Sequence, residues 1–229
     1  MYPVVKRLMD ITLSGLALVV LSPLLIPVSI GLLVTGEHYV FYFQQRIGRY
    51  NKKFGIWKFA TMLKNSPNLT GGLHTTRRDP RVLPLGHFLR MTKINELPQL
   101  VNILMGDMSI VGPRPLVDKT FDPYPEHVRK VIYNVRPGLT GIGSIVFRDE
   151  ERLLSDSGMP LEEFYAKHIA PAKGELELWY QKNLSFRTDV MIIFLTAWVI
   201  AFPKSPLIHS VFKDLPELKV PGLAWGKAV

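Results

Sequence analysis

A long apolar run near the start of the chain limits what this sequence can fold into. The run from Ile11 to Val34 contains no Asp, Glu, Lys or Arg. As a straight helix it would measure about 36 Å, which exceeds the roughly 30 Å hydrocarbon core of a bilayer. It is longer than the apolar part of a secretory signal, and no small-residue cleavage site follows it. We therefore expect a retained membrane element.

Two prolines in the middle of this run decide how it can lie in a bilayer. Pro23 and Pro27 carry no backbone N–H and should bend the helix, and the Ser22 hydroxyl can bond to a carbonyl that has lost its donor. Basic residues at both flanks favour placing both ends in the cytoplasm. They are Lys6, Arg7, Arg46, Arg49, Lys52 and Lys53. The residues leave two structures open: a kinked single span, and a bent helix that enters and leaves through one leaflet.

The rest of the chain predicts short elements. A second uncharged run, 190–202, is too short to span a membrane, so we expect an interfacial or core helix with Trp198 at the headgroup level. Aromatic and β-forming residues predict short strands at 39–44 and 54–59. Apolar spacing predicts helices at 97–105, 161–168 and 176–183. These elements indicate an α-rich α+β fold with short, amphipathic interfacial helices.

Charge and composition narrow the class of ligand. Segment 44–136 carries 16 basic and 6 acidic residues, which favours an anionic partner such as phosphate groups, acidic lipid or nucleic acid. The chain contains no cysteine, which excludes disulfides, thiolate metal sites and a cysteine nucleophile. The six histidines lack the spacing of a catalytic zinc site. No nucleic-acid-binding motif is present, so we do not expect a nucleic-acid partner.

Charged residues between 77 and 115 form the strongest candidate site. Asn95 is expected to cap the helix that follows, which would place Glu96 at the positive end of the helix dipole, where phosphate groups also bind. Arg114 lies between two prolines, so an extended backbone would present it as a phosphate clamp. The cluster also contains Arg77, Arg78, Asp79, Arg81, Arg90 and Lys93.

Each of these residues has a simpler explanation when it is taken alone. Asn95 can be a cap, Asp79-Pro80 is an ordinary turn signal, and the arginines can face anionic lipid. Taken together beside a membrane element, the carboxylate of Glu96, the arginines and the helix start indicate magnesium-assisted chemistry on phosphate groups at the bilayer surface.

A series of short motifs supports a more specific interpretation. In chain order they are Lys6-Arg7-x-x-Asp10, Ser22-Pro23, Gln45-Arg46-x-Gly48, Lys58-Phe59, Asp79-Pro80-Arg81, Glu96-Leu97-Pro98-Gln99, Gly106-Asp107-Met108-Ser109, Gly112-Pro113-Arg114-Pro115, Pro137-Gly138-Leu139-Thr140-Gly141, and Asn183-Leu184-Ser185 with Asp189. In this order and over roughly residues 6–200, the chain resembles the bacterial sugar transferases known as small monotopic phosphoglycosyl transferases.

The resemblance implies a fold and a location. It implies a re-entrant membrane helix at 1–36 with its kink at Ser22 and Pro23, a cytosolic transferase domain at 37–203 and a C-terminal tail at 204–229. The protein would lie in the inner leaflet of a bacterial inner membrane, on the cytoplasmic face. Family members are often dimeric, so a homodimer is also implied.

The resemblance also implies an activity. This is transfer of a sugar phosphate from a UDP-sugar to undecaprenyl (polyprenol) phosphate, giving polyprenol-diphosphate-sugar and UMP during glycoconjugate, exopolysaccharide or lipopolysaccharide synthesis. The implied cofactor is Mg²⁺, and Glu96 inherits the metal-binding role by position. The residues implied for substrate and phosphate binding are Lys58, Asp79, Arg81, Arg90 and Arg114.

Two positions depart from the family pattern. Asn95 stands where the family has a nucleophilic Asp, and Ala60 stands where it has an arginine. A neutral amide is a poor nucleophile, which leaves three explanations. Glu96 itself attacks while other oxygens hold the metal, or the lipid phosphate attacks directly in a ternary complex. In the third, the two changes leave a protein that binds the substrates as a scaffold or regulator without turnover.

Overall fold

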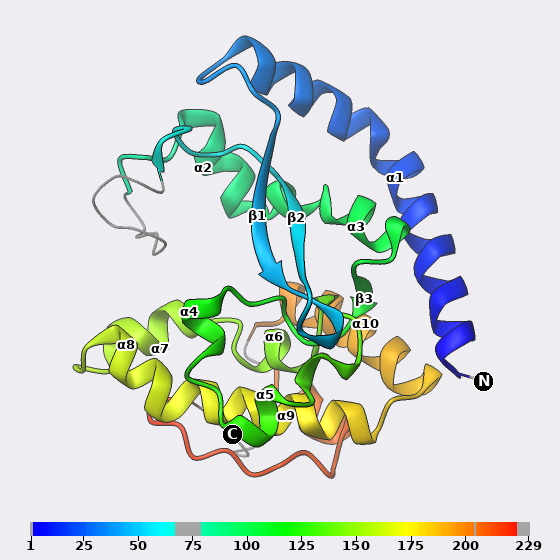
Figure 1. Ribbon diagram of the computed structural model, residues 1–229, viewed down its shortest axis with the longest axis vertical. Helices are drawn as coiled ribbons and strands as arrows, with labels where there is room; N and C mark the ends of the chain where they lie inside the picture. The colour runs from blue at the N-terminus through cyan, green and yellow to red at the C-terminus, as the bar shows by residue number, and fades with distance from the viewer. Residues whose placement is uncertain (1, 67–78, 204, 224–229) are drawn as a thin grey trace. The chain divides into compact units, whose positions relative to one another are not determined.

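The computed structural model describes residues 2–66, 79–203 and 205–223. Within these ranges the protein is a helix-rich α+β structure with a long apolar N-terminal helix and two small two-stranded sheets (Figure 1). The chain divides into two compact units. Unit 1 comprises Met1–Asp10, Arg46–Phe54 and Asp107–Val229, and unit 2 comprises Ile11–Gln45 and Gly55–Gly106. The predicted α-rich α+β class is therefore confirmed.

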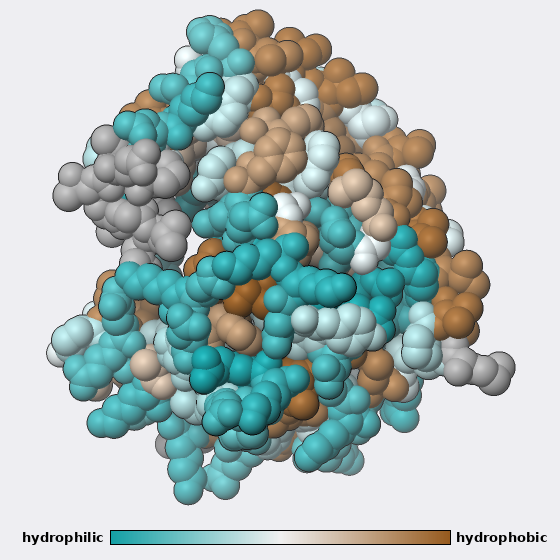
Figure 2. All heavy atoms as spheres, viewed as in Figure 1, coloured by the Kyte–Doolittle hydropathy of each residue, from teal (hydrophilic) through white to brown (hydrophobic). Residues whose placement is uncertain are grey.

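Helix α1 (Tyr2–Val34) runs without a break through Pro23 and Pro27. The Ser22 hydroxyl donates a 2.7 Å hydrogen bond to the carbonyl of Val19, the group that Pro23 leaves without its usual donor. In the part of the chain that the structure describes, α1 is the one helix long and apolar enough to cross a membrane. Its apolar side chains are largely exposed (Figure 2), which is consistent with membrane association.

Strands β1 (Phe41–Ile47) and β2 (Lys53–Phe59) form a hairpin around the turn η1 (Arg49–Asn51). β2 begins one residue before the prediction, whereas β1 starts two residues late and extends to Ile47, whose N–H bonds to the carbonyl of Leu116. The side chain of Asn102 covers the outer edge of β2. Its Oδ1 accepts from the N–H of Trp57 and its Nδ2 donates to the carbonyl of Gly55, both at 2.9 Å.

Unit 2 is completed by α2 (Pro84–Met91), η3 (Ile94–Glu96) and α3 (Gln99–Met105). Leu32, Phe59 and Leu89 form its small core. At Gly86 the first turn of α2 approaches the segment after β2 so closely that an added Cβ would lie 2.2 Å from the carbonyl oxygen of Thr61. A glycine is therefore required here for α2 to pack against that segment.

In unit 1, β3 (Ser109–Val111) and β4 (Gly138–Thr140) pair in parallel, with Ser109 opposite Gly138. The two backbones meet closely just beyond β3, because an added Cβ at Gly138 would lie 2.1 Å from the N atom of Gly112. Two of the short motifs found in the sequence are thus packed directly on each other through their glycines.

Unit 1 also contains a series of helices, of which α10 packs on both strands. They are α4 (Asp118–Phe121), α5 (Glu126–Arg129), η4 (Ile132–Asn134), α6 (Ile142–Val146), α7 (Glu150–Asp156), α8 (Leu161–Phe164), η5 (Tyr165–Ile169), α9 (Ala170–Lys182), α10 (Phe186–Ala201) and α11 (Leu207–Val211). The helices predicted at 161–168 and 176–183 fall within one helical stretch, α8–η5–α9. The C-terminal segment belongs to the hydrophobic core of unit 1, in which it buries Ile208, Phe212, Leu218 and Val220.

The second apolar run lies on α10, which begins earlier than predicted because Ser185 caps it by accepting a hydrogen bond from the N–H of Thr188. Ile192 and Leu195 of α10 are buried, whereas Phe194 and Ile200 are exposed. The helix therefore has both a core face and an exposed apolar face.

Buried polar contacts fix the first turns of α1 within unit 1. The fully buried carboxylate of Asp189 accepts hydrogen bonds from the hydroxyls of Tyr2 and Tyr180 and pairs with Lys6 at 2.5 Å. One turn further along α1, Asp10 accepts hydrogen bonds from the hydroxyl of Ser109 at 3.0 Å and the N–H of Ile110 at 2.9 Å. These contacts dock residues 2–10 on β3 and α10.

Candidate functional site

The segment that follows β2 organises the predicted site residues of unit 2. The N–H of Leu63 bonds to the carbonyl of Arg81 at 2.9 Å, and the N–H of Leu83 bonds to the carbonyl of Thr61 at 3.0 Å. This antiparallel contact aligns the end of β2, which carries Lys58, with the segment that carries Asp79 and Arg81. Six of the seven predicted catalytic and binding residues lie in this unit.

Asp79 and Arg81 form a buried bidentate pair. Arg81 Nε and Nη2 lie 2.8 and 2.6 Å from the two Asp79 oxygens, and Nη1 donates to the carbonyl of Ser66 at 3.0 Å. The hydrogen bonds from Arg81 lower the pKa of Asp79 to about 2, with a smaller contribution from the positive charge of Arg90. Arg77 and Arg78, predicted as part of the same charged turn, lie outside the described residues.

Arg90 lies in the last turn of α2 and connects this pair to the segment that follows β2. Its Nη1 is 3.5 Å from the hydroxyl oxygen of Thr61, and its charge acts on Asp79. Sequence reasoning missed Thr61 and Ser66 as partners of the arginines, because a hydroxyl and a backbone carbonyl leave no pattern in the sequence.

The expected cap at Asn95 is wrong. Lys93 adopts a left-handed conformation with φ of 59°, and the chain then makes the tight turn η3, closed by the bond from the N–H of Leu97 to the carbonyl of Ile94. Helix α3 starts only at Gln99, after Pro98. Asn95 and Glu96 therefore lie in the turn before the helix, and Glu96 is not in the first turn of α3.

The two side chains of η3 have different surroundings. Asn95 is 8% exposed, and its buried Oδ1 accepts no hydrogen bond from the residues that the structure describes. Glu96 is half-buried, and its Oε1 lies 3.8 Å from Nζ of Lys58 on β2. Ala60, at the position of the missing arginine, is 1% exposed. The turn thus presents one paired carboxylate and one buried neutral amide oxygen.

The donor atoms in η3 fit Mg²⁺. No group of three or more His, Cys, Asp or Glu side chains is found in the described ranges, which argues against an all-protein metal cage there. Mg²⁺ is usually bound by one or two carboxylates together with water and substrate phosphates. The Glu96 carboxylate and the unsatisfied amide oxygen of Asn95 are hard oxygen donors of the required kind.

Arg114, the seventh predicted residue, belongs to unit 1 and follows β3. Three hydrogen bonds hold the backbone around it. The Tyr133 hydroxyl donates to the carbonyl of Arg114 at 2.7 Å, and the N–H of Gly138 donates to the carbonyl of Pro113 at 2.8 Å. Arg46 Nη1 donates to the carbonyl of Pro115 at 3.3 Å. The flanking prolines are buried and the Arg114 side chain is exposed. A fixed backbone thus presents a solvent-facing guanidinium.

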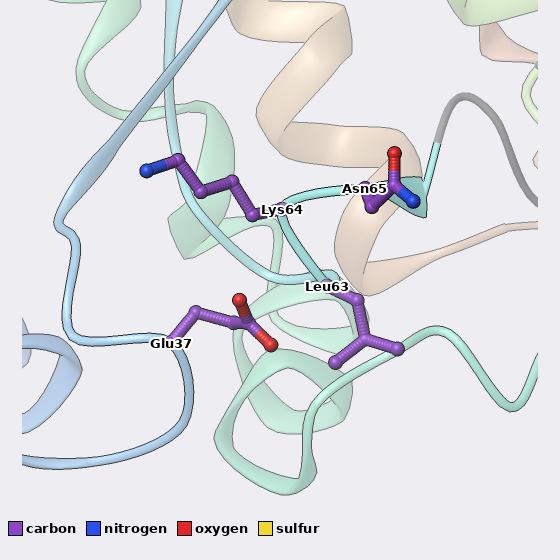
Figure 3. A pocket seen from close by; sticks show the side chains of 4 residues that line it. All are labelled: Glu37, Leu63, Lys64 and Asn65. Atoms are coloured by element: carbon purple, nitrogen blue, oxygen red, sulfur yellow. The ribbon is translucent and has the colours of Figure 1, made fainter.

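Two pockets lie away from these residues. One in unit 2, of about 360 Å³, is lined by Glu37, Leu63, Lys64 and Asn65, which come from the loop after α1 and the segment after β2 (Figure 3). Another in unit 1, of about 410 Å³, lies among α9, α10 and α11. Neither of these two pockets is lined by a predicted site residue.

The apolar helix α1 is consistent with a class of membrane-associated proteins, and the lysine and arginine side chains near Glu96 and Asp79 have the chemistry that binds phosphate groups. Comparison with known proteins narrows this class. Residues 1–203 match the model of the family described as bacterial sugar transferase. The chain belongs to the bacterial sugar transferase family, as the resemblance predicted.

Individual relatives agree with this assignment. The chain is 34% identical over 205 residues to the exopolysaccharide production protein ExoY of Sinorhizobium fredii, covering 83% of each protein. It is 32% identical over 213 residues to the undecaprenyl-phosphate galactose phosphotransferase of Salmonella typhimurium, covering 85% of this chain and 40% of that protein. It is 34% identical over 200 residues to a UDP-glucose:undecaprenyl-phosphate glucose-1-phosphate transferase of Klebsiella pneumoniae, covering 85% of this chain and 40% of that protein. The chain thus spans about two fifths of the length of several relatives.

Proposed function

We propose that this protein transfers a sugar phosphate from a UDP-sugar to undecaprenyl phosphate, releasing UMP. An oxygen of the lipid phosphate forms a bond to the β-phosphorus of the UDP-sugar. The bond from that phosphorus to the α–β bridging oxygen breaks, and UMP leaves with the oxygen and its electron pair. The total charge is the same before and after the reaction, and no proton is transferred, when the reactant undecaprenyl phosphate and the product UMP are both dianions. The printed names of the relatives support this substrate pair.

The observation that carries the proposal is the Lys58–Glu96 pair in a chain of this family. Glu96 would hold Mg²⁺, which when bound neutralises charge on the reacting phosphates. Lys58 orients the Glu96 carboxylate, and Lys58 and Arg90 supply positive charge to the diphosphate. Because Asp79 and Ser66 already engage the guanidinium of Arg81, we give the Asp79–Arg81 pair the role of positioning Arg90.

Arg114 keeps its proposed role in phosphate binding. Its guanidinium is exposed, and three hydrogen bonds hold the backbone that carries it. A fixed, solvent-facing guanidinium can bind a phosphate group through two parallel hydrogen bonds.

Asn95 determines the proposed route. A neutral amide cannot form the covalent phosphosugar intermediate expected of an Asp at this position, so we assign the attack to the lipid phosphate itself. In this route the amide oxygen of Asn95 is a ligand or acceptor within the site, which agrees with its burial without a described partner.

The direct test is UMP release from a panel of UDP-sugars with undecaprenyl phosphate and Mg²⁺, using the wild-type chain, Asn95→Asp and Glu96→Gln. The proposal expects release by the wild type and a loss of about 100-fold or more in Glu96→Gln. Glu37→Gln is the matched control, because Glu37 lines the pocket of Figure 3 in the same unit. Full activity of Glu96→Gln would contradict the role of Glu96.

A second candidate function is binding of the same substrates without turnover, as a scaffold or regulator. The buried neutral Asn95 and the apolar Ala60 favour it. Under this function the wild type would bind the UDP-sugar but release no UMP, and Asn95→Asp would restore release. Robust wild-type turnover would rule it out.

For the membrane element, the proposal is a re-entrant α1 with both ends on the cytoplasmic face of the inner membrane. Pro23, Pro27 and the Ser22–Val19 hydrogen bond support a helix adapted to bend inside lipid. The chain has no native cysteine, so Pro3→Cys and His38→Cys can be labelled singly. The re-entrant arrangement expects both to react with an impermeant thiol reagent only from the cytoplasmic side. Labelling from opposite sides would indicate a span.

A further inference from the structure

Three arginines of unit 1 come from segments far apart in the chain. Arg7 lies on the first turns of α1, Arg49 lies in the turn η1 of the hairpin, and Arg136 lies two residues before β4. All three side chains are half-buried. The function proposed above uses none of them.

Backbone contacts bring these three segments together. Arg49 Nε donates to the carbonyl of Asn134 at 3.4 Å, two residues before Arg136. Lys6 Nζ donates to the carbonyl of Val111 at 2.9 Å, so the turn of α1 that carries Arg7 is docked on β3. The N–H of Ser109 on β3 bonds in turn to the carbonyl of Pro137, directly after Arg136, at 2.8 Å. The three segments that carry Arg7, Arg49 and Arg136 are therefore neighbours in unit 1.

The electrostatics agree with this proximity. Burial lowers the pKa of Arg136, and the nearby positive charges of Arg49 and Arg7 lower it further, while Asp10 acts in the opposite direction. Asp10 already accepts hydrogen bonds from the hydroxyl of Ser109 and the N–H of Ile110. Arginine stays charged in proteins, so the three half-buried side chains bring positive charges near one another in a partly desolvated place. Such clustering is unfavourable by itself and becomes favourable when an anion binds.

The position along α1 indicates where that anion comes from. Arg7 lies four residues before Ile11, where the uncharged run begins, which is about 6 Å along a helix. Arginines at the end of a membrane helix reach the headgroup level. We propose that Arg7, Arg49 and Arg136 form a binding site for a lipid-borne phosphate group.

This inference deepens the proposed function, since undecaprenyl phosphate is such a lipid, and a phospholipid headgroup is the other source of the same chemistry. The test is equilibrium binding by the full chain in phosphatidylcholine nanodiscs, titrated with undecaprenyl phosphate, with phosphatidylglycerol and with inorganic phosphate. The variants are Arg136→Gln, Arg49→Gln and the conservative Arg136→Lys. Arg152→Gln is the control, because Arg152 is exposed on α7 of the same unit.

We expect Arg136→Gln and Arg49→Gln to weaken binding of undecaprenyl phosphate at least about tenfold, with partial recovery in Arg136→Lys. Their thermal midpoints should not fall below that of the wild type, because removing one like charge relieves repulsion. If only undecaprenyl phosphate is affected, the site is specific for the acceptor. If phosphatidylglycerol is affected equally, it is a general site for lipid phosphate.

Unchanged binding of both lipids would overturn the inference, as would an effect on inorganic phosphate alone. Two glutamine variants at separate segments keep the test decisive if one of them does not fold. Because the readout is binding, it is independent of turnover. Absence of UMP release would defeat the proposed function and leave this measurement intact, whereas a negative result here would leave the role of Glu96 unaffected.

Discussion

Lys58 Nζ lies 3.8 Å from Glu96 Oε1, and the two side chains are 17% and 18% exposed. The pair joins the end of β2 to the turn η3, two segments that are separated in the chain by the whole of α2. A charge pair with this limited exposure is screened less by water than a surface pair. It therefore links the orientation of the only carboxylate in η3 to the hairpin strand.

The first prediction concerns this pair. Lys58→Met should reduce UMP release by about tenfold or more, because it removes both the partner of Glu96 and a positive charge near the diphosphate. Lys58→Arg should recover part of the activity. UMP release is the measurement, in the wild-type and Asn95→Asp backgrounds. Lys64→Met, on the pocket of Figure 3, is the control, and equal losses in both lysine variants would contradict the role of Lys58.

A second prediction follows from the pKa of Asp79, about 2 in the folded protein against an ordinary 3.8. The folded state holds this carboxylate ionised, so the pair contributes stability above about pH 4 that is lost as the pH falls toward 2. Asp79→Asn should lower the thermal midpoint at pH 7. In this variant the midpoint should also decrease less than in the wild type as the pH is lowered from 4 to 2. Glu37→Gln, the control, should show the same dependence of the thermal midpoint on pH as the wild type. An unchanged acid profile in Asp79→Asn would show that this pair does not stabilise unit 2.

A third prediction concerns Glu177 on α9, a buried carboxyl group whose Oε2 has no hydrogen-bond partner among the described residues. Burial raises its pKa from 4.5 to about 8, although Lys173 and the N–H of Gly143 act in the opposite direction. The unfolded chain releases this proton near pH 4.5 and the folded chain near pH 8. Stability should therefore fall as the pH rises between these values, by at most about 1.4 kcal/mol per pH unit, and stay level above pH 8.

Glu177→Gln should remove this slope while Glu175→Gln, on the exposed side of the same helix, should keep it. Thermal midpoints in detergent at pH 5, 6.5 and 8 provide the measurement. The same slope in Glu177→Gln as in the wild type would assign the pH dependence to another group.

The fourth prediction tests the close approach of β3 and β4. Gly138→Ala should destabilise unit 1 by about 3 kcal/mol, because the new methyl group would meet the backbone of Gly112 at 2.1 Å. Gly55→Ala is a fair comparison, since an added Cβ there has open space. Chemical denaturation followed by tryptophan fluorescence would measure both. A mild effect at Gly138 would mean that the two strands separate at little cost.

The fifth prediction concerns the buried carboxylate of Asp189. Asp189→Asn leaves the ammonium of Lys6 without its counter-charge and should cost about 3–5 kcal/mol. The exposed Asp156→Asn, on α7, should change stability by less than about 0.5 kcal/mol. Limited proteolysis should also cut between α1 and β1 more readily in Asp189→Asn. Equal stability of the two variants would show that α1 is held by other contacts.

The features that could be predicted from the sequence are those with a local signal. The uncharged run from Ile11 to Val34 is enough to predict α1, and β-forming residues place the start of each hairpin strand close to where it lies. The hydrogen bond from Ser22 to Val19 could be predicted because a proline always frees a carbonyl four residues earlier.

Other features depend on contacts between distant residues. β3 and β4 are short strands that pair across the intervening helices α4 and α5, which leaves no periodic pattern to detect. Asn95 has the chemistry of a cap, but the left-handed Lys93 turns the chain before α3 begins. The raised pKa of Glu177 and the proximity of Arg7, Arg49 and Arg136 likewise arise only when separate segments pack together.

The ion pair between Lys6 and Asp189 also sets an order of events during synthesis. Its two partners are 183 residues apart, and the apolar part of α1 lies between them and emerges early. At roughly 5–20 residues per second, about 10 to 40 s pass between translation of Lys6 and of Asp189. During that interval Lys6 lacks the counter-charge of Asp189, so the first turns of α1 do not yet have the contact that docks them on α10. The docking of the first turns of α1 on unit 1 is therefore a late step, which waits until most of the chain has been synthesised.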